Sequence, residues 1–432
     1  MLLNFHALSQ DWLQKFNEGQ GKLEGGVYRA FHENGQVIVK GEIKNNQKEG
    51  IWMAYRANGT LEVQATFTNN KLHGPLYHFD ENELLISQTY YRENQRTGIF
   101  IAYYENGQYA LEGRFKDGLK DSTWTEYSPL GYRTFEKNYE NGKRQGTWKF
   151  FSDNYGRLVA VERYQMGVEN GQWLIYHSNR KLAKEFHFKK GILHGPYKEF
   201  YPNGKKSVEG KYTEGRKAEK WLSFFKNGNL FSIGDYESDR KTGLWKYFFE
   251  DGNIESEGRY NDDEKNGQWL EYHANGAIAE VGSFARNEKD GLWGVFYPNG
   301  QLYQEENWQM GRLLNVSEPF TIKGQALEKG SFVDGNGQFI QYWPEGQTRA
   351  VSLFANGYLQ GAYSSYYEDG LVESKGNMAK GLEDGLWEYF FPSGRKQASG
   401  AYENGKKVGE WRYYSNRGKL REVINHSEEA TN

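Results

Sequence analysis

The sequence predicts an all-β fold, in which about 17 tandem β-hairpin repeats of 24 residues form an elongated, single-layer antiparallel sheet that twists into a ribbon or superhelix. Three observations support this prediction. Large aromatic residues recur every 24 residues, turn sequences recur between them, and polar and apolar residues alternate in the second half of each period. A lone hairpin is marginal in water, so each repeat must be stabilised by its neighbours.

The first strand of each repeat is rich in aromatic residues, which favours β structure. We number each repeat from its first aromatic residue, position 0. Tryptophan occupies position 0 in most repeats, and we expect these side chains to be structural: Trp52, Trp124, Trp148, Trp173, Trp221, Trp245, Trp269, Trp293, Trp387 and Trp411. The remaining repeats have Tyr28, Leu76, Phe100, Tyr197, Ser317, Phe339 and Tyr363 at this position.

A turn sequence follows the first strand, most often Asn-Gly as in Asn34-Gly35 and Asn275-Gly276, with Asp251-Gly252 as a variant. These pairs predict two-residue type I′ loops, because both central residues of that turn need positive φ. A two-residue loop would place position 0 opposite position +13. That position is glycine in many repeats, namely Gly41, Gly113, Gly210, Gly234, Gly258, Gly282, Gly330, Gly376 and Gly400. We therefore expect the ring of each repeat to cover its own glycine.

Two further aromatic series flank these positions. Position +15 should place a second ring on the same face as position 0: Phe67, Tyr91, Phe115, Tyr139, Tyr212, Tyr236, Tyr260, Phe284 and Trp308. Position +3 differs from position 0 by an odd number, so its ring should point to the opposite face. A single-layer sheet cannot bury both faces, which makes the position +3 rings the candidate interaction surface. They are Tyr103, Tyr127, Phe151, Tyr176, Phe200, Phe224, Phe248, Tyr272, Phe296, Tyr342, Tyr366 and Phe390.

The repeat frame sets the expected domain boundaries. Residues 1–25 form an N-terminal cap, either a half-repeat, which we prefer from Phe16 to Gly19, or a short helix carrying Phe5, Leu8, Trp12 and Phe16. Residues 26–310 hold repeats 1–12, residues 311–336 a degenerate repeat, residues 337–425 further repeats, and residues 426–432 a C-terminal tail. In the degenerate repeat Ser317 replaces tryptophan, and two residues are missing between Phe332 and Phe339. Two interpretations of this segment stay open: a repeat whose sequence has drifted, and a bend that has a function.

Composition excludes several classes of function. A net charge of −3 and a pI near 6.4 provide no basic footprint for nucleic acid, and membrane association is disfavoured for the same reason. The absence of cysteine excludes disulfides and thiol chemistry. No apolar run approaches the roughly 18 residues that span a bilayer, and the N-terminus does not resemble a signal peptide. We expect a cytoplasmic protein, with an exported mature form as the open alternative.

No catalytic residue, cofactor site or metal site is predicted. His73 and His194 share one turn position, and His177 and His273 share position +4 of distant repeats, too far apart for one metal ion. The acidic run Asp262 to Glu264 is expected to be a solvated loop. The segment Asp334 to Gln338 resembles a calcium loop without its closing glutamate. The chain is therefore not expected to be an enzyme.

The residues Glu257 to Tyr260 and Gly400 to Trp411 resemble the MORN repeat, and more closely the MORN-variant repeat of a bacterial family described as antitoxins of toxin–antitoxin systems. The resemblance covers roughly residues 20–425. It implies hairpin arrays that act as protein-binding scaffolds, with lipid contact in some MORN proteins, and it supplies no catalytic residue.

The leading hypothesis is a non-enzymatic scaffold, monomeric or weakly oligomeric, that binds another protein such as a toxin along an aromatic-rich face and acts as an antitoxin or immunity protein. Two alternatives stay open: a carbohydrate- or cell-wall-binding repeat protein, since aromatic faces stack on sugars, and a membrane-surface-associated scaffold.

Overall fold

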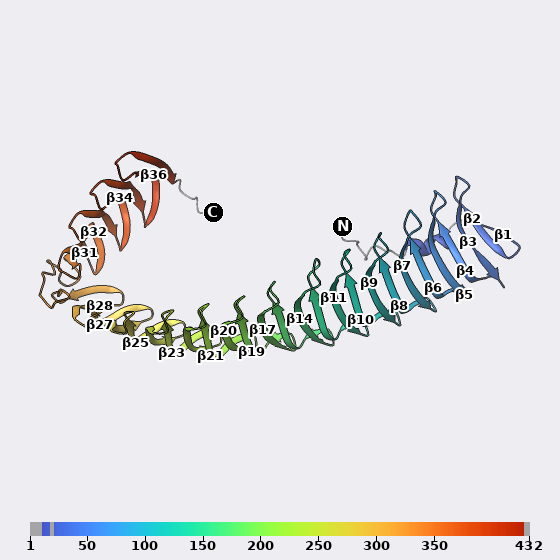
Figure 1. The fold of residues 1–432 in the computed structure, drawn as a ribbon, viewed down its shortest axis with the longest axis horizontal. Coiled ribbons are helices and arrows are strands. Elements are labelled where there is room, and N and C mark those ends of the chain that lie inside the picture. Colours follow the sequence, from blue (N-terminus) through green and yellow to red (C-terminus); the bar gives the residue numbers. More distant parts are fainter. Residues whose placement is uncertain (1–10, 18–20, 427–432) are drawn as a thin grey trace. The chain divides into compact units, whose positions relative to one another are not determined.

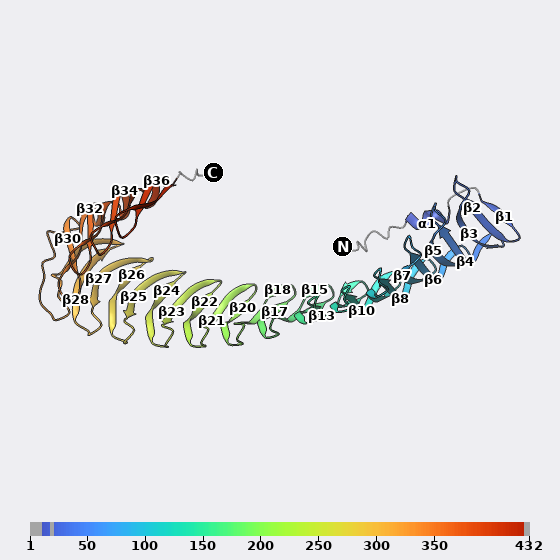
Figure 2. The same cartoon turned by 45° about the horizontal axis from the view of Figure 1, so that its top comes forward.

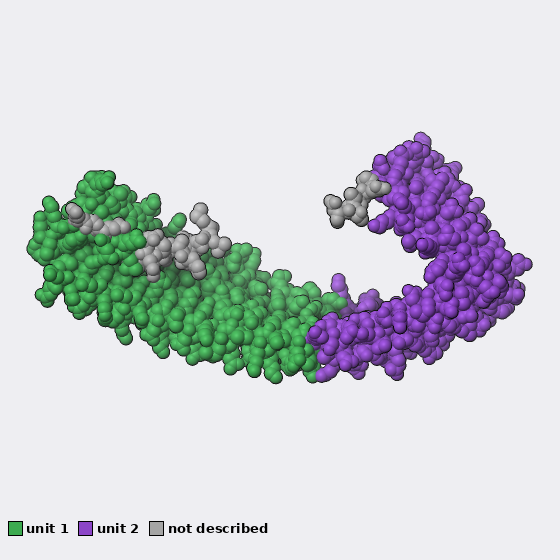
Figure 3. Space-filling view, turned by 180° about the vertical axis from the view of Figure 1, so that it is seen from behind, with its two compact units in different colours: residues 1–215 green, residues 216–432 purple. Residues whose placement is uncertain are grey.

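The computed structural model describes residues 11–17 and 21–426, and its contacts divide the chain into two compact units, Met1–Gly215 and Arg216–Asn432 (Figure 3). The predictions for Phe5, Leu8, Gly19 and the tail beyond His426, together with the side chain of Trp12, lie outside the described part of the chain.

Unit 1 begins with one short helix and continues as β strands in chain order (Figure 1). Its elements are α1 (Asp11–Lys15), β1 (Lys22–Glu24), β2 (Val27–Phe31), β3 (Val37–Lys44), β4 (Gln47–Tyr55), β5 (Leu61–Thr68), β6 (Lys71–Phe79), β7 (Leu85–Arg92), β8 (Gln95–Tyr103), β9 (Tyr109–Lys116), β10 (Leu119–Tyr127), β11 (Arg133–Glu140), β12 (Lys143–Arg144), β13 (Gly146–Phe151), β14 (Leu158–Gln165), β15 (Val168–Glu169), β16 (Gly171–Tyr176), β17 (Leu182–Lys189), β18 (Ile192–Leu193), β19 (Gly195–Phe200) and β20 (Lys206–Thr213).

Unit 2 consists of strands and connecting turns (Figure 2). Its strands are β21 (Arg216–Phe224), β22 (Leu230–Glu237), β23 (Arg240–Phe248), β24 (Ile254–Asn261), β25 (Glu264–Tyr272), β26 (Ile278–Ala285), β27 (Glu288–Phe296), β28 (Leu302–Gln309), β29 (Arg312–Val316), β30 (Gly337–Tyr342), β31 (Thr348–Ala355), β32 (Tyr358–Tyr366), β33 (Val372–Ala379), β34 (Leu382–Phe390), β35 (Lys396–Glu403), β36 (Lys406–Tyr414) and β37 (Leu420–His426).

Most strands that follow one another in the chain pair antiparallel, as β23 with β24 and β24 with β25, whereas β29 and β30 belong to different sheets and do not pair. The predicted all-β fold of tandem hairpins in open antiparallel sheets is therefore confirmed. The predicted register is also confirmed, because Trp245 pairs with Gly258, and Trp387 with Gly400, thirteen residues later in each case.

The hairpin loops differ from the predicted type. In the first repeat, His32 N–H donates to the carbonyl of Gln36 (2.7 Å) and Gly35 N–H donates to the carbonyl of His32 (2.9 Å). Gly35 has a φ of +84°, whereas Asn34 is not among the residues with positive φ. The loop is thus a three-residue connection closed by a glycine bulge, and the type I′ prediction was wrong. The register survives because the ladder shifts by one residue between Ala30 and Phe31.

The two-residue loops instead connect one repeat to the next. Asn45 and Asn46 have φ values of 50° and 60°, and they join Lys44 to its pairing partner Gln47. Positive φ at both central residues is the signature of a type I′ turn, whose twist suits a tight hairpin. Asparagine tolerates this conformation because its short side chain bonds locally, so these turns do not require glycine.

At the start of the chain, Asp11–Lys15 form the helix α1, the alternative to the half-repeat that the sequence favoured. Phe16 follows the helix and is buried against the first tryptophan. Its ring lies edge-on to Phe67, with 5.4 Å between the ring centroids, and 6.5 Å from the ring of Trp52. The helix thereby covers the tryptophan side of the first repeats.

The degenerate repeat keeps its turn but loses its strands. Residues 317–336, all of them described, contain only isolated bridges. Pro319 has no N–H to donate to a strand ladder. The side-chain hydroxyl of Ser317, and not a backbone carbonyl, accepts the hydrogen bond from Glu305 N–H (3.0 Å). Gly324 N–H still donates to Thr321 (2.8 Å), as in a regular hairpin loop. The sequence frame was therefore correct here, although the strands are interrupted.

The aromatic packing also continues through this repeat. Phe332 is fully buried, and its ring centroid lies 5.7 Å from that of Phe339 and 5.1 Å from that of Phe354. Phe332 takes the place of the position +15 ring in a regular repeat. The missing residues shorten the connection without removing a ring from the core.

Candidate functional site

Each sheet has a tryptophan face, which carries the side chains of positions 0 and +15, and an opposite face, which carries those of positions −1, +1 and +3. This division follows from the alternation of side chains along a strand. The two faces differ in how completely the protein fills them, and that difference determines where a partner can bind.

On the tryptophan face, most indoles cover a glycine of the preceding repeat, whereas Trp148 and Trp173 have Lys137 and Glu162 at that place. A Cβ atom at Gly258 would overlap the ring of Trp269, and the same holds for Gly282 and Trp293. The expectation that a ring covers the glycine of its own repeat was therefore wrong. Trp245 pairs with Gly258 along the ladder, but the ring that occupies the space above this glycine comes from the next hairpin.

A hydrogen bond to the preceding hairpin fixes most of these indoles. Trp269 Nε1–H donates to the carbonyl of Arg259 (3.1 Å), the residue that follows the covered glycine. Bonds of 2.8–3.3 Å to the carbonyl ten residues earlier are made by Trp52, Trp124, Trp148, Trp173, Trp245, Trp269, Trp293, Trp387 and Trp411. A buried N–H that lacked such a partner would be costly.

The rings of positions 0 and +15 form a continuous ladder. Centroid distances are 5.3 Å from Tyr260 to Trp269, 6.0 Å from Trp269 to Phe284 and 5.0 Å from Phe284 to Trp293, all edge-to-face. Lys265 Nζ lies 4.2 Å from the Trp269 ring centroid, a cation–π contact that covers the ladder from solvent. The same arrangement recurs at Lys48, Lys120, Lys217, Lys241 and Lys289.

Of the ten tryptophans expected to be structural, nine are buried and Trp173 is half-buried. Glu162 stands eleven residues before Trp173, where a buried tryptophan such as Trp269 has glycine. Trp148 is nevertheless buried although Lys137 stands eleven residues before it, so a side chain at that place does not by itself expose the indole. The lysines four residues before position 0 were missed by sequence reasoning, although their recurrence at one position was a usable signal.

The position +3 rings lie on the opposite face, where all of the candidate residues from Tyr103 to Phe390 are half-buried. Neighbouring side chains account for their burial. Tyr272 O–H donates to Glu257 Oε1 (2.9 Å), and Glu257 Oε2 lies 2.7 Å from Lys246 Nζ. The hydrogen bond from Lys246 is the main cause that lowers the pKa of Glu257. Because tyrosines of this series such as Tyr272 hydrogen-bond to a carboxylate that is itself ion-paired, they contribute less free apolar surface than the sequence suggested.

Tyr127 shows the same environment in unit 1. Burial raises the pKa of Tyr127 to about 12, and its hydrogen bond to Glu112 Oε1 (2.7 Å) acts in the same direction. The phenol therefore stays protonated and donates to the carboxylate at physiological pH. This pairing is structural rather than catalytic in its chemistry, since no nucleophile results.

Exposed aliphatic side chains of the opposite face recur at position −1, which the sequence analysis did not single out. The aliphatic side chains there are 45–65% exposed: Ile51 and Ile99 in unit 1, and Leu244, Leu292 and Leu386 in unit 2. The recurring Gly-Ile-Trp or Gly-Leu-Trp sequence was a signal for them, because the neighbour of an inward tryptophan must point outward.

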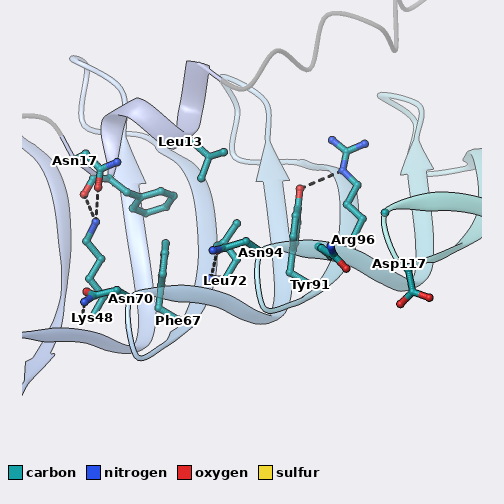
Figure 4. Close-up of a pocket in the computed structure, with 13 residues that line it drawn as sticks. Leu13, Asn17, Lys48, Phe67, Asn70, Leu72, Tyr91, Asn94, Arg96 and Asp117 are labelled. Atoms are coloured by element: carbon teal, nitrogen blue, oxygen red, sulfur yellow. Dashed lines mark hydrogen bonds between the residues drawn. The ribbon is translucent and has the colours of Figure 1, made fainter.

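A cavity of about 730 Å³ lies beside α1 on the tryptophan face of unit 1 (Figure 4). Leu13, Phe16 and Tyr91 supply apolar walls. Lys48 Nζ donates to the carbonyl of Phe16 (2.7 Å), so this lysine holds the end of the helix against the sheet. Arg96 Nε donates to the hydroxyl of Tyr91 (3.1 Å). These contacts make the cavity part of the packing between α1 and the hairpins.

The histidines are hydrogen-bonded between repeats. Nε2 of His177 lies 2.8 Å from the carbonyl of Phe200, and Nε2 of His273 lies 2.8 Å from that of Phe296, 23 residues further along the chain in each case. Within the described residues, no group of three or more His, Asp or Glu side chains is placed to hold a metal ion. Over the same residues, no helix has the length and apolar composition that a membrane crossing requires.

These features define the chain as a tandem β-hairpin repeat protein in which each tryptophan joins one hairpin to the next. The family model described as the MORN repeat variant matches residues 24–45, 96–117, 193–214, 241–262 and 289–310. Every match starts four residues before a position 0 residue. The family model therefore divides the chain into repeats at the same places as the 24-residue numbering used above. The chain therefore contains repeats of the MORN-variant type.

No curated protein matches the chain. Among solved structures, the crystal structure of TcdB2-TccC3 is similar at 12% identity, covering 92% of this chain and 25% of that chain with a TM-score of 0.15. A mutant of the TCP10 domain of Danio rerio CPAP is similar at 14% identity, covering 59% of this chain and 99% of that chain with a TM-score of 0.15. The chain thus spans about a quarter of the first of these structures. TM-scores this low carry no information about function.

Proposed function

We propose that this protein is a non-enzymatic scaffold that binds another protein along the face of its sheets opposite the tryptophan side chains. The repeat architecture provides an extended surface, as in other solenoid and repeat arrays. The rings and lysines of the ladder cover most of the tryptophan face. Their side chains already contact one another, so few of them are free to contact a partner protein.

The recurring exposed aliphatic residue at position −1 is the observation that carries this proposal. Leu244 and Leu292 occupy the same position of alternate repeats in unit 2, beside ion pairs such as Lys246–Glu257. Apolar side chains surrounded by charged groups are the composition of a protein interface, in which the apolar centre supplies affinity and the polar rim supplies specificity. Exposed aliphatic residues that recur at one position of a repeat are otherwise a cost in solubility.

A capture experiment tests the proposal. The unaltered protein and a variant with serine at Ile51, Ile99, Leu244, Leu292 and Leu386 are each used as bait in lysate of the native cell. We expect defined partners to bind the unaltered protein and to be lost from the variant. A control variant carries serine at exposed hairpin-tip residues, namely Glu33, Glu105, Glu250, Glu368 and Asn416, and should retain them. Equal capture by all three proteins would contradict the proposal.

Within this function, we propose a toxin as the partner, which would make the protein an antitoxin or immunity protein. The similarity of its repeats to those of the antitoxin-type MORN family supports this assignment. Co-expression with the product of each neighbouring gene provides the test. We expect one neighbour to arrest growth alone and to be neutralised by this protein. If no neighbour is toxic, or if growth is not restored, the antitoxin assignment is wrong and the scaffold function is unaffected.

A further inference from the structure

A hollow of about 640 Å³ lies over strands β7 to β10 of unit 1. It is lined by Arg92 from β7, Ile99 from β8, and Arg114 and Lys116 from β9. Arg114 and Lys116 flank Phe115, which is buried on the tryptophan face. By alternation, both cations belong to the opposite face, the one that the proposed function uses.

The hollow has an excess of positive charge. Arg92, Arg114 and Lys116 are exposed, and none of them makes an ion pair or a side-chain hydrogen bond with any described residue. Asp121 is the acidic residue of the lining. It is the pairing partner of Arg114 along the ladder, and its carboxylate accepts a hydrogen bond from Ser122 Oγ (2.9 Å). Three cations thus face one carboxylate, whereas elsewhere on this face cations such as Lys246 are paired with carboxylates.

Apolar side chains lie between the cations. Tyr90 is 38% exposed and Ile99 is 47% exposed, and both line the hollow. Ile99 pairs with Arg114 in the register of β8 and β9. A ligand that fills the hollow therefore meets aliphatic and aromatic carbon as well as positive charge. A free inorganic anion would make no use of that carbon.

The spacing of the cations suits a peptide. Arg114 and Lys116 are two residues apart on one strand, or roughly 7 Å. Arg92 lies two strands away, or roughly 10 Å across the sheet, and is displaced along the strands as well, since it pairs with Gln95 whereas Arg114 pairs with Ile99. One small anion cannot contact all three at these separations. Four to five residues of extended chain, or roughly 13–17 Å, span such distances, so carboxylates on either side of an apolar residue can reach the cations together.

We propose that this hollow binds an acidic segment of a partner protein, with carboxylates paired to Arg92, Arg114 and Lys116 and a large apolar side chain against Ile99 and Tyr90. The proposal rests on the proposed scaffold function and assigns a partner chemistry to one part of the binding face. Unpaired cations around an apolar centre raise the association rate of an acidic partner and favour it over partners of other charge.

The test uses a fluorescent peptide of sequence Gly-Glu-Glu-Leu-Glu-Glu-Gly and the full-length protein, with binding followed by anisotropy at low and at physiological ionic strength. We expect saturable binding that weakens as salt is added. Replacing the glutamates by glutamine should abolish binding, and replacing the leucine by serine should weaken it severalfold. Absence of binding by the acidic peptide, or equal binding by the glutamine peptide, would overturn the proposal.

Protein variants locate the binding. The triple variant Arg92→Gln, Arg114→Gln and Lys116→Gln should weaken binding about tenfold or more and remove most of its salt dependence. Ile99→Ser should weaken it severalfold without changing the salt dependence. A control with the same loss of charge at exposed residues outside the hollow, Lys189→Gln, Lys220→Gln and Lys406→Gln, should bind as the unaltered protein does. Equal affinity of the two triple variants would overturn the assignment.

Competition and capture distinguish a site for an acidic segment from a general anion site. If inorganic phosphate or anionic vesicles displace the peptide at equivalent charge concentration, the hollow is a general anion site and the proposal is wrong. In the capture experiment, the triple variant should lose the partner. A partner that depends on the position −1 residues but not on these cations would leave the scaffold function standing and contradict the role of the hollow.

Discussion

The indole ring of Trp269 occupies the space that a side chain at Gly258 would need, and it donates a hydrogen bond to the carbonyl of the next residue, Arg259. Because the two residues belong to consecutive hairpins, this contact joins one repeat to the next. Ala65 stands eleven residues before Leu76, where the smaller side chain of leucine leaves room for a methyl group.

Gly258→Ala should lower the free energy of unfolding by about 1–3 kcal/mol, because the added methyl forces the indole or the strand to move. In a Trp269→Leu background, which reproduces the Ala65 and Leu76 pair, the same change should cost less than about 1 kcal/mol. A double-mutant cycle from denaturant unfolding measures the coupling. Equal costs in the two backgrounds would show that the ring does not require the glycine.

Trp269→Ala and Trp173→Ala should differ in their effects. Trp269 is buried, so its loss should cost about 3–5 kcal/mol. Trp173 is half-exposed behind Glu162, and its loss should cost about 1–2 kcal/mol, since less apolar area leaves water. Hydrogen exchange of β24 and β25 in one variant, and of β14 and β16 in the other, reports the local loss. Similar losses at both sites would show that the buried area of the indole does not determine its contribution to stability.

His78 should make stability depend on pH. Burial lowers the pKa of His78 to about 4 in the folded protein, whereas an unfolded histidine titrates near 6.5. Between these values the unfolded chain binds a proton that the folded protein does not, so stability falls as the pH drops from about 6.5, and the loss is complete below about 4. The difference between the two pKa values corresponds to about 3 kcal/mol.

The comparison of His78→Gln with the unaltered protein isolates this contribution, because other groups titrate equally in both. The slope of unfolding free energy against pH between about 4 and 6.5 should flatten in the variant. An unchanged slope in His78→Gln would mean that His78 has the same protonation in the folded and the unfolded protein.

Asn275 should stabilise its hairpin through two bonds. Its Oδ1 accepts from Ala277 N–H (3.1 Å) and its Nδ2 donates to the carbonyl of Pro298 in the next repeat (2.7 Å). Asn275→Ala removes both and should cost about 1–2 kcal/mol. Asn275→Asp keeps the first bond, as Asp251 does for Asn253, and should cost less. Thermal unfolding of the two variants ranks them, and the reverse order would exclude the bond between repeats as a stabilising contact.

The hairpins could be predicted because their signals are local. The 24-residue period and the alternation in strands such as Ile254 to Tyr260 depend on residues close in the chain, and they led to the correct pairing of Trp245 with Gly258. The turn type was missed because Asn-Gly also suits a three-residue loop closed by a glycine bulge. Only backbone geometry, with positive φ at Gly35 and not at Asn34, distinguishes the two.

The candidate surface was predicted in part. The rings from Tyr103 to Phe390 do lie on the face opposite the tryptophans, but their exposure depends on residues of the adjacent repeat, as Tyr272 shows with Glu257. The exposed aliphatic residues and the unpaired cations around Ile99 were not found, since charge balance at a surface depends on which side chains reach one another across strands.

The sequence by itself determined that this protein is an array of hairpins with two chemically different faces, because strand propensity, alternation and period act within a single repeat. Only the tertiary structure decided which glycine each tryptophan covers. The separations of 13 and 11 residues add up to one period of 24, so the periodic sequence is compatible with the ring of either hairpin. The choice is made by packing, since the shift in register between repeats places the indole of the following hairpin over the bare stretch of strand.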